Sequence, residues 1–198
     1  MDVELKAGDI FLTRGNSIIS RLIRFFSRNI GESRTMVNHV GLIVEPGVLR
    51  TAVEIEAIRF VTRRTLWSGY GPPNTDCVAI FRANNLTEDD IRKITARAQS
   101  MVGVRYGWIA IVAHLLDWCL NGAYVFRRLV PGKRYPICSW LVADAFAKAG
   151  KYFGVAPGAA EPDDIWDFVT SHEPAYYMQV YPLQKLADSE SGPAGIKP

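Results

Sequence analysis

Residues 135–150 have the sequence Tyr-Pro-Ile-Cys-Ser-Trp-Leu-Val-Ala-Asp-Ala-Phe-Ala-Lys-Ala-Gly. Pro136 cannot lie inside a helix, whereas the alanine, leucine and lysine residues after it favour one, and Gly150 suits the left-handed residue that often ends one. The pattern therefore predicts a helix that begins near Cys138. Apolar residues recur at helical spacing after this cysteine, so we expect its side chain to face the core.

A cysteine at the first turn of a helix has a chemical consequence. Unpaired amide hydrogens and the positive end of the helix dipole lie there, and both favour a thiolate, which is the nucleophilic form. Free cysteine is also among the most buried residue types, so a purely structural role is the alternative for Cys138. Its position alone leaves both roles open.

Two segments are predicted to pair as a β-hairpin. Residues 37–44 form an apolar run before a Pro-Gly turn, and residues 51–57 alternate between apolar and polar positions. A tight turn would place Glu54 opposite His39, whereas a loop longer by two residues would place Glu56 there. In either register a carboxylate faces the histidine.

These residues have complementary roles in acyl-transfer chemistry. His39 would take the thiol proton of Cys138 and later protonate the leaving group, while the carboxylate would orient the imidazole and stabilise its charged form. The backbone amides of Cys138 and Ser139 would stabilise an oxyanion. No residue pattern requires a metal or an organic cofactor, so we expect neither.

Four motifs occur in a fixed order along the chain: Asn38-His39-Val40-Gly41-Leu42-Ile43-Val44, Val53-Glu54-Ile55-Glu56-Ala57, Gly103-Val104-Arg105-Tyr106-Gly107-Trp108 and Cys138-Ser139-Trp140-Leu141-Val142. In order and spacing they resemble the circularly permuted NlpC/P60 family, the YiiX/LRAT-like group of the papain-like cysteine hydrolase superfamily. In that group the histidine precedes the cysteine. The resemblance extends from about residue 8 to residue 165.

The resemblance implies an α+β, papain-like fold in which the cysteine helix packs against a small antiparallel sheet that carries the histidine. It also implies Cys138 as the nucleophile and His39 as the general base. The third position in this group is commonly a glutamate within a Glu-Ala pair, which corresponds to Glu56 because Ala57 follows it. Glu54 remains the alternative, since the hairpin register is open.

Tyr106 resembles a tyrosine that lines the substrate cleft in related proteins, although the sequence after Trp108 departs from their glycine pair. The remaining cysteines and histidines are predicted to be structural. We expect core positions for Cys77, Cys119 and His114, and a helix-end surface position for His172.

Length and composition fit one globular domain. The chain has 198 residues, of which 48% are hydrophobic and 22% charged, so we expect a single domain over residues 1–186 and a flexible tail over residues 187–198. The other expected elements are buried strands at residues 8–13 and 77–82, helices that start near Thr87 and Pro162, a loop over residues 65–76 and a last strand at residues 176–181.

The charge and the cysteine content restrict the partners and the compartment. A net charge of +3, with no nucleotide-binding or zinc-binding spacing, argues against a nucleic-acid partner. The three cysteines have no disulfide-framework spacing, and the first residues show no signal-peptide pattern. We therefore expect a protein that is cytoplasmic as synthesised, with phage lysis or a secretion system as the delivery route of a wall-directed enzyme.

Three functions are compatible with these residues. The first is a peptidase or amidase that acts on bacterial cell-wall peptides. The second is an acyl-directed hydrolase or acyltransferase at a membrane surface, for which Arg21, Arg24 and Arg28 would form the basic face of an amphipathic helix and residues 106–118 would hold an acyl chain. The third is a catalytically silent binding module, which the retention of the cysteine, histidine and carboxylate disfavours. The sequence leaves the oligomeric state open.

Overall fold

The computed structural model describes residues 3–14, 36–71, 77–105, 137–172 and 177–181. Within these residues the strands form a six-stranded antiparallel sheet of order β6-β5-β3-β2-β7-β8 and a two-stranded pair of β1 with β4. The strands are β1 Glu4–Leu5, β2 Ile10–Thr13, β3 His39–Glu45, β4 Gly47–Val48, β5 Val53–Ala57, β6 Val61–Thr65, β7 Val78–Ala83 and β8 Tyr177–Tyr181. The helices are α2 Leu66–Tyr70, α3 Glu88–Gln99, α6 Cys138–Ala147, the 3₁₀-helix η2 Pro157–Ala159 and α7 Pro162–Ser171.

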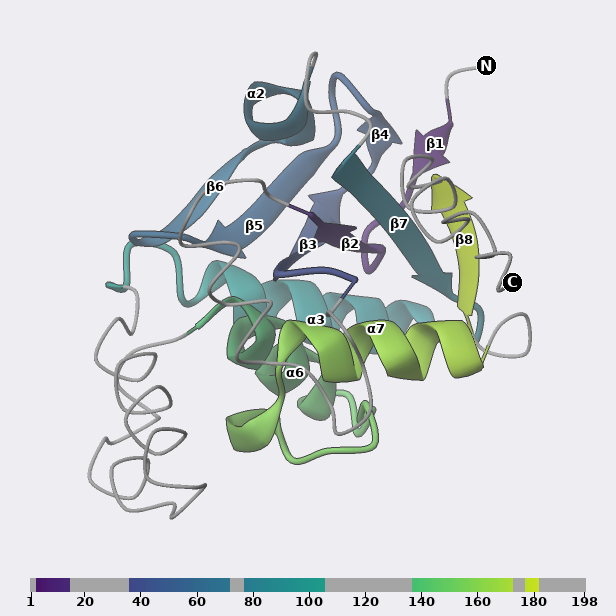
Figure 1. Cartoon of the computed structure of the whole chain (residues 1–198). Helices are drawn as coiled ribbons and strands as arrows, with labels where there is room; N and C mark the ends of the chain where they lie inside the picture. The colour runs from purple at the N-terminus through teal and green to yellow at the C-terminus, as the bar shows by residue number, and fades with distance from the viewer. Residues whose placement is uncertain (1–2, 15–35, 72–76, 106–136, 173–176, 182–198) are drawn as a thin grey trace, which may run out of the picture.

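The sheet has packed elements on both sides. Figure 1 shows α3, α6 and α7 gathered on one side, with α2 on the other beside β5 and β6. Neighbouring residues of a strand point to opposite faces, so each central strand contributes side chains to both sides. The cluster on the three-helix side includes Ile10, Leu12, Val40, Leu42, Ile55, Leu141, Val142 and Phe146. The smaller cluster on the α2 side includes Leu5, Phe11, Ile43, Leu66 and Ile80.

Helix α6 begins and ends as its sequence predicts. Cys138 is its first residue and is 5% exposed, and the predicted apolar face is buried in the core. Gly150 has a φ of +71°, a conformation that favours glycine. The Lys151 amide then donates to the Phe146 carbonyl at 3.1 Å, which satisfies one of the last carbonyls of the helix.

The two other predicted helices that fall within the described residues, those that start near Thr87 and Pro162, are also present. Thr87 caps α3: its hydroxyl accepts from the Asp90 amide at 3.2 Å, and its own amide donates to the Asp90 carboxylate at 3.0 Å. Pro162 is the first residue of α7, where the absence of an amide hydrogen costs nothing. The predicted strands appear as β2, β3, β5, β7 and β8, and β3 pairs with β5 as expected.

Two predictions about individual segments, a loop and a buried cysteine, were wrong. Residues 65–76 were expected to form a loop, but α2 occupies Leu66–Tyr70, because Leu66 is fully buried in the smaller cluster and its amide bonds to the Ala52 carbonyl. Cys77 was expected in the core but is only half-buried, because it stands just before β7 begins at Val78.

Candidate active site

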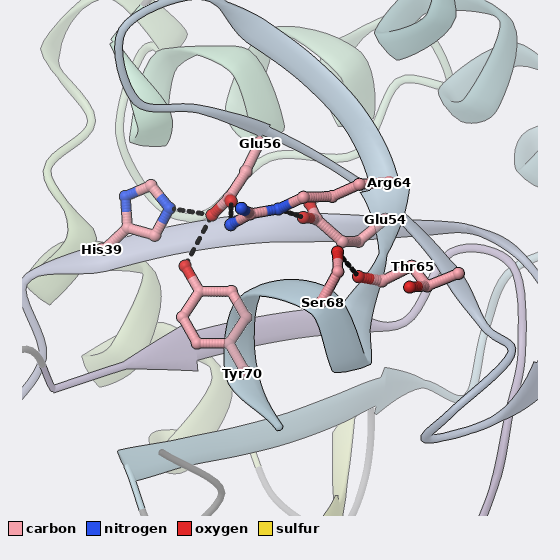
Figure 2. Close-up of polar contacts among 7 residues, drawn as sticks. All are labelled: His39, Glu54, Glu56, Arg64, Thr65, Ser68 and Tyr70. Atoms are coloured by element: carbon pink, nitrogen blue, oxygen red, sulfur yellow. Dashed lines mark hydrogen bonds and ion pairs between the residues drawn. The ribbon is translucent and has the colours of Figure 1, made fainter. Parts of the chain in front are cut away.

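His39 and Glu56 are in direct contact. His39 is the first residue of β3, and its Nε2 atom lies 2.6 Å from Oε2 of Glu56, a fully buried residue of β5 (Figure 2). Strand pairing places Glu56 opposite Gly41, so Glu56 is a diagonal neighbour of the histidine. The predicted pairing directly opposite His39 was therefore wrong for both glutamates, because the connection between the two strands is longer than either predicted loop and contains β4. The prediction that a carboxylate shares the histidine's face is confirmed.

Gly41 creates the space in which this contact forms. A Cβ atom at Gly41 would lie 2.2 Å from Cζ of Phe11 and 3.1 Å from Cβ of Glu56. The ring of Phe11 therefore covers the backbone at this position and packs near His39, with ring centroids 6.5 Å apart. A side chain here would displace the ring or the glutamate.

Two further residues bind the glutamates, and the sequence analysis did not identify them. Tyr70 donates its hydroxyl hydrogen to Oε2 of Glu56 at 2.6 Å, and Arg64 donates from Nε to Oε1 of Glu54 at 2.9 Å and from its terminal nitrogen to Oε1 of Glu56 (Figure 2). The sequence contained a signal for such a partner: when two acids lie two positions apart on a buried strand face, a nearby cation or a neutral form of one acid must offset the cost of burying them.

The two glutamates differ in charge. Burial disfavours the charged form of Glu56, but the hydrogen bond and charge of His39, the hydrogen bond from Tyr70 and the charge of Arg64 outweigh it and lower its pKa to about 2. In Glu54, burial and the charge of Glu56 raise the pKa to about 9 despite Arg64. At neutral pH Glu56 is thus the carboxylate beside the histidine, and Glu54 is a neutral acid.

His39 is coupled to Cys138 as well as to Glu56. Burial opposes the imidazolium, but the charge of Cys138 and a hydrogen bond with its side chain, followed by the hydrogen bond and charge of Glu56, raise the histidine pKa to about 10. Because Nε2 of the ring contacts Glu56, Nδ1 is the nitrogen left for the thiol. The structure therefore brings the predicted cysteine, histidine and glutamate together around one imidazole.

The start of α6 supplies backbone donors at the cysteine. The amides of the first turn of a helix have no carbonyl four residues back within the helix, and Cys138 and Ser139 are the first two residues of α6. Ile137, the residue before the helix, makes no capping hydrogen bond with its side chain. The predicted oxyanion-binding amides thus occupy a helix N-terminus, where the helix dipole also favours negative charge.

Several predicted features lie outside the described residues. These are Tyr106, the basic face of Arg21, Arg24 and Arg28, the apolar residues 106–118 with His114, Cys119, and the tail over residues 187–198. His172 is described and ends α7, where its ring stacks on Phe168 with centroids 4.0 Å apart, which confirms its helix-end position. In the part of the chain that the structure describes, no helix is long and apolar enough to cross a membrane.

The fold is α+β, and the site combines a helix-start cysteine with a histidine and a buried glutamate. No family model matches the chain, and no curated protein matches it significantly. Among solved structures, the chain is similar to the crystal structure of the metalloprotein yiiX from Escherichia coli O157:H7, with a TM-score of 0.53 and 17% sequence identity over 76% of this chain and 69% of that one. At this identity the likeness shows a shared fold.

Because yiiX is described as a metalloprotein, the metal-binding capacity of the described residues bears on the site. Over residues 3–14, 36–71, 77–105, 137–172 and 177–181, no group of three or more His, Cys, Asp and Glu side chains is arranged to hold a metal ion. Nε2 of His39 and both oxygens of Glu56 are already engaged in hydrogen bonds. The described residues therefore do not fit a metal centre.

Replacing Glu54 with Gln is expected to remove a loss of stability that the wild type undergoes as the pH rises from about 4.5 to about 9. The folded-state pKa of Glu54 is about 9, above its ordinary value of 4.5. The unfolded chain therefore loses this proton first as the pH rises, and the folded state loses stability from about pH 4.5 upward. Gln has no proton to lose, so the unfolding free energy of Glu54→Gln should rise relative to that of the wild type by up to about 4 kcal/mol between pH 5 and pH 8, at about 1.4 kcal/mol per pH unit.

Urea denaturation at the two pH values measures this effect. Glu45→Gln, which alters an exposed partner of Arg63, serves as the control and should show no such gain. A Glu54→Gln variant that is equally destabilised at both pH values would mean that Glu54 is ionised in the folded protein.

Proposed function

We propose that this protein is a cysteine-dependent hydrolase of amide or ester bonds that works through an acyl-enzyme, with a papain-like fold of the permuted NlpC/P60 type. The observation that carries the proposal is the position of His39, coupled to Cys138 and held 2.6 Å from the ionised Glu56. The motif order along the chain and the likeness to yiiX support the fold assignment.

In the proposed first step, the Cys138 thiolate attacks the substrate carbonyl carbon, and the carbonyl oxygen becomes an oxyanion that accepts hydrogen bonds from the amides of Cys138 and Ser139. The imidazolium of His39 then donates its proton to the leaving amine or alcohol. The carbon–nitrogen or carbon–oxygen bond breaks, and a thioester remains on the cysteine.

In the second step, neutral His39 accepts a proton from water, and the resulting hydroxide attacks the thioester. The carboxylic acid leaves and the thiolate is restored beside the imidazolium. Glu56 stays ionised throughout: it orients the ring through Nε2 and stabilises its positive charge in both steps.

We propose bacterial cell-wall peptides as the substrate class. The resembled family includes enzymes that cut bacterial cell-wall peptides, and this resemblance in motif order supports the choice. The competing substrate class is an acyl ester, acyl amide or phospholipid. One product analysis, described next, distinguishes the two classes.

The experiment is mass spectrometry of products after the purified chain is incubated with digested cell wall and, separately, with a panel of acyl esters, amides and phospholipids. Cys138→Ala is the inactive variant. Cys77→Ala is the matched control, because it removes a half-buried cysteine outside the site and should retain activity.

Wall-peptide fragments that require Cys138 would support the wall peptidase. If acyl chains are released or transferred and this also requires Cys138, the substrate class is an acyl compound and not a wall peptide. The proposed acyl-enzyme mechanism would then still hold. Products that form equally with Cys138→Ala, or no products at all together with an unreactive thiol, would reject the hydrolase and favour a binding module.

A further inference from the structure

Both oxygens of the Glu56 carboxylate are held by residues other than the histidine. Arg64 donates to Oε1, and Tyr70 donates to Oε2 at 2.6 Å, the same oxygen that contacts His39 (Figure 2). These donors come from β6 and α2, while the acceptor belongs to β5. The carboxylate is thus held at both of its oxygens by residues of β6 and α2, in addition to its contact with His39 of β3.

A buried carboxylate needs such donors to remain charged. Glu56 is fully buried, and burial by itself favours the neutral acid. Arg64 is the cation that balances it, because the second acid on this guanidinium, Glu54, is held neutral by burial and by the charge of Glu56. The arginine charge is therefore directed mainly to the one carboxylate that contacts the histidine.

The backbone of α2 leaves room for the guanidinium. A Cβ atom at Gly69 would lie 2.4 Å from a terminal nitrogen of Arg64 and 2.8 Å from its Cζ atom. The guanidinium also lies 5.9 Å from the ring centroid of Tyr70, within the range of a cation–π contact. Arg64 is thus packed between the short helix and the strand that carries both acids.

We propose that Arg64 and Tyr70 are positioning residues that keep Glu56 ionised and aimed at His39, and that they thereby set the pH range over which Cys138 is a nucleophile. The inference rests on the proposed function for the roles of Cys138 and His39. The groups that face Glu56 are His39 from β3, Glu54 from β5, Arg64 from β6 and Tyr70 from α2. Cys138 from α6 and Glu56 face the histidine.

The direction in which the pH dependence of Cys138 should shift follows from the contacts of Glu56 with Arg64 and His39. Loss of the arginine charge removes an opposite charge from beside Glu56, and such a charge shifts a carboxyl pKa by about 1–3 units. As the pH falls toward this raised pKa, Glu56 becomes neutral and stabilises the imidazolium less, so less of the thiolate–imidazolium pair is present at acid pH than in the wild type. The acid limb of Cys138 reactivity should therefore move to higher pH by about one unit, with a rate about tenfold lower on that limb.

The experiment measures the rate at which iodoacetamide alkylates Cys138 between pH 4 and pH 10, read from the Cys138 peptide by mass spectrometry so that the other cysteines do not interfere. The full-length chain is used, and no substrate is needed. The variants are Arg64→Gln, Tyr70→Phe, which removes one hydroxyl, and Gly69→Ala, which displaces the guanidinium without deleting it. Arg63→Gln is the matched control, because Arg63 is the preceding residue and pairs with exposed Glu45.

We expect all three variants to shift the acid limb upward and Arg63→Gln to leave it unchanged. A wild-type thiol no faster than glutathione at pH 6 would reject the proposed function itself. If the wild-type Cys138 reacts fast and the folded variants show the same acid limb as the wild type, only the positioning role of Arg64 and Tyr70 would be rejected. If Arg64→Gln does not fold, as judged by circular dichroism, Tyr70→Phe and Gly69→Ala decide the question.

Discussion

Replacing His39 with Ala is expected to lower Cys138-dependent turnover by about 10²–10⁴-fold, the usual contribution of a positioned acid–base group. The variant loses both the acceptor of the thiol proton and the donor to the leaving group. It also leaves the buried Glu56 without the imidazolium that contacts it at 2.6 Å. Turnover of the substrate found by product analysis, together with the alkylation rate of Cys138, measures the loss.

The pH dependence of wild-type turnover tests the role of His39 in a second way. The charge of Cys138 and the contact with Glu56 raise the histidine pKa to about 10, so the imidazolium is present below that pH and is lost as the pH rises through it. Turnover should therefore fall on the alkaline side near pH 10 and not near pH 7. In Glu56→Gln the imidazolium loses its anionic partner, and this alkaline limb should move to lower pH.

His172→Ala is the control for His39→Ala. His172 ends α7 and stacks on Phe168, apart from the site, so its replacement should leave turnover within about twofold. Wild-type turnover in His39→Ala would contradict the assigned base. An alkaline limb near pH 7 in the wild type would contradict the coupling of this histidine to Cys138 and Glu56.

Replacing Gly41 with Ala is expected to destabilise the protein by about 1–3 kcal/mol or more, the usual cost of overpacking a core. The new methyl group would lie 2.2 Å from Cζ and 2.4 Å from Cε1 of Phe11. Phe11 is fully buried, and its ring packs against Tyr70 with centroids 5.3 Å apart, so it has no free space to enter. Urea denaturation gives the change in unfolding free energy.

The clash also predicts a rescue. Leu has no atoms at the positions of the outer ring carbons of Phe11, so the double variant Gly41→Ala, Phe11→Leu should lose less stability than the sum of the two single variants. Gly158→Ala is the control, because a Cβ atom there would meet nothing within 4 Å. Additive losses in the double variant would contradict the close approach of Phe11 to the strand.

Local patterns predicted much of the fold. The helix of Cys138, the helices that start after Thr87 and at Pro162, and the hairpin with His39 all follow from apolar periodicity, caps and turn residues, which act within a few positions of the chain. The short helix α2 was missed because its five residues have a glycine and aromatic content typical of a loop. Burial of Leu66 against the sheet, a tertiary contact, stabilises it there.

The sequence by itself determined the nucleophile candidate, the base candidate and the presence of a carboxylate on the histidine's face, because strand and helix periodicities decide which side chains share a face. Only the tertiary structure showed that Glu56, and not Glu54, contacts His39, and that Arg64 and Tyr70 bind this carboxylate. The strand register depends on how the connection between β3 and β5 runs, and part of it pairs with β1. The charge of each glutamate depends on burial and on donors from β6 and α2, which no local pattern contains.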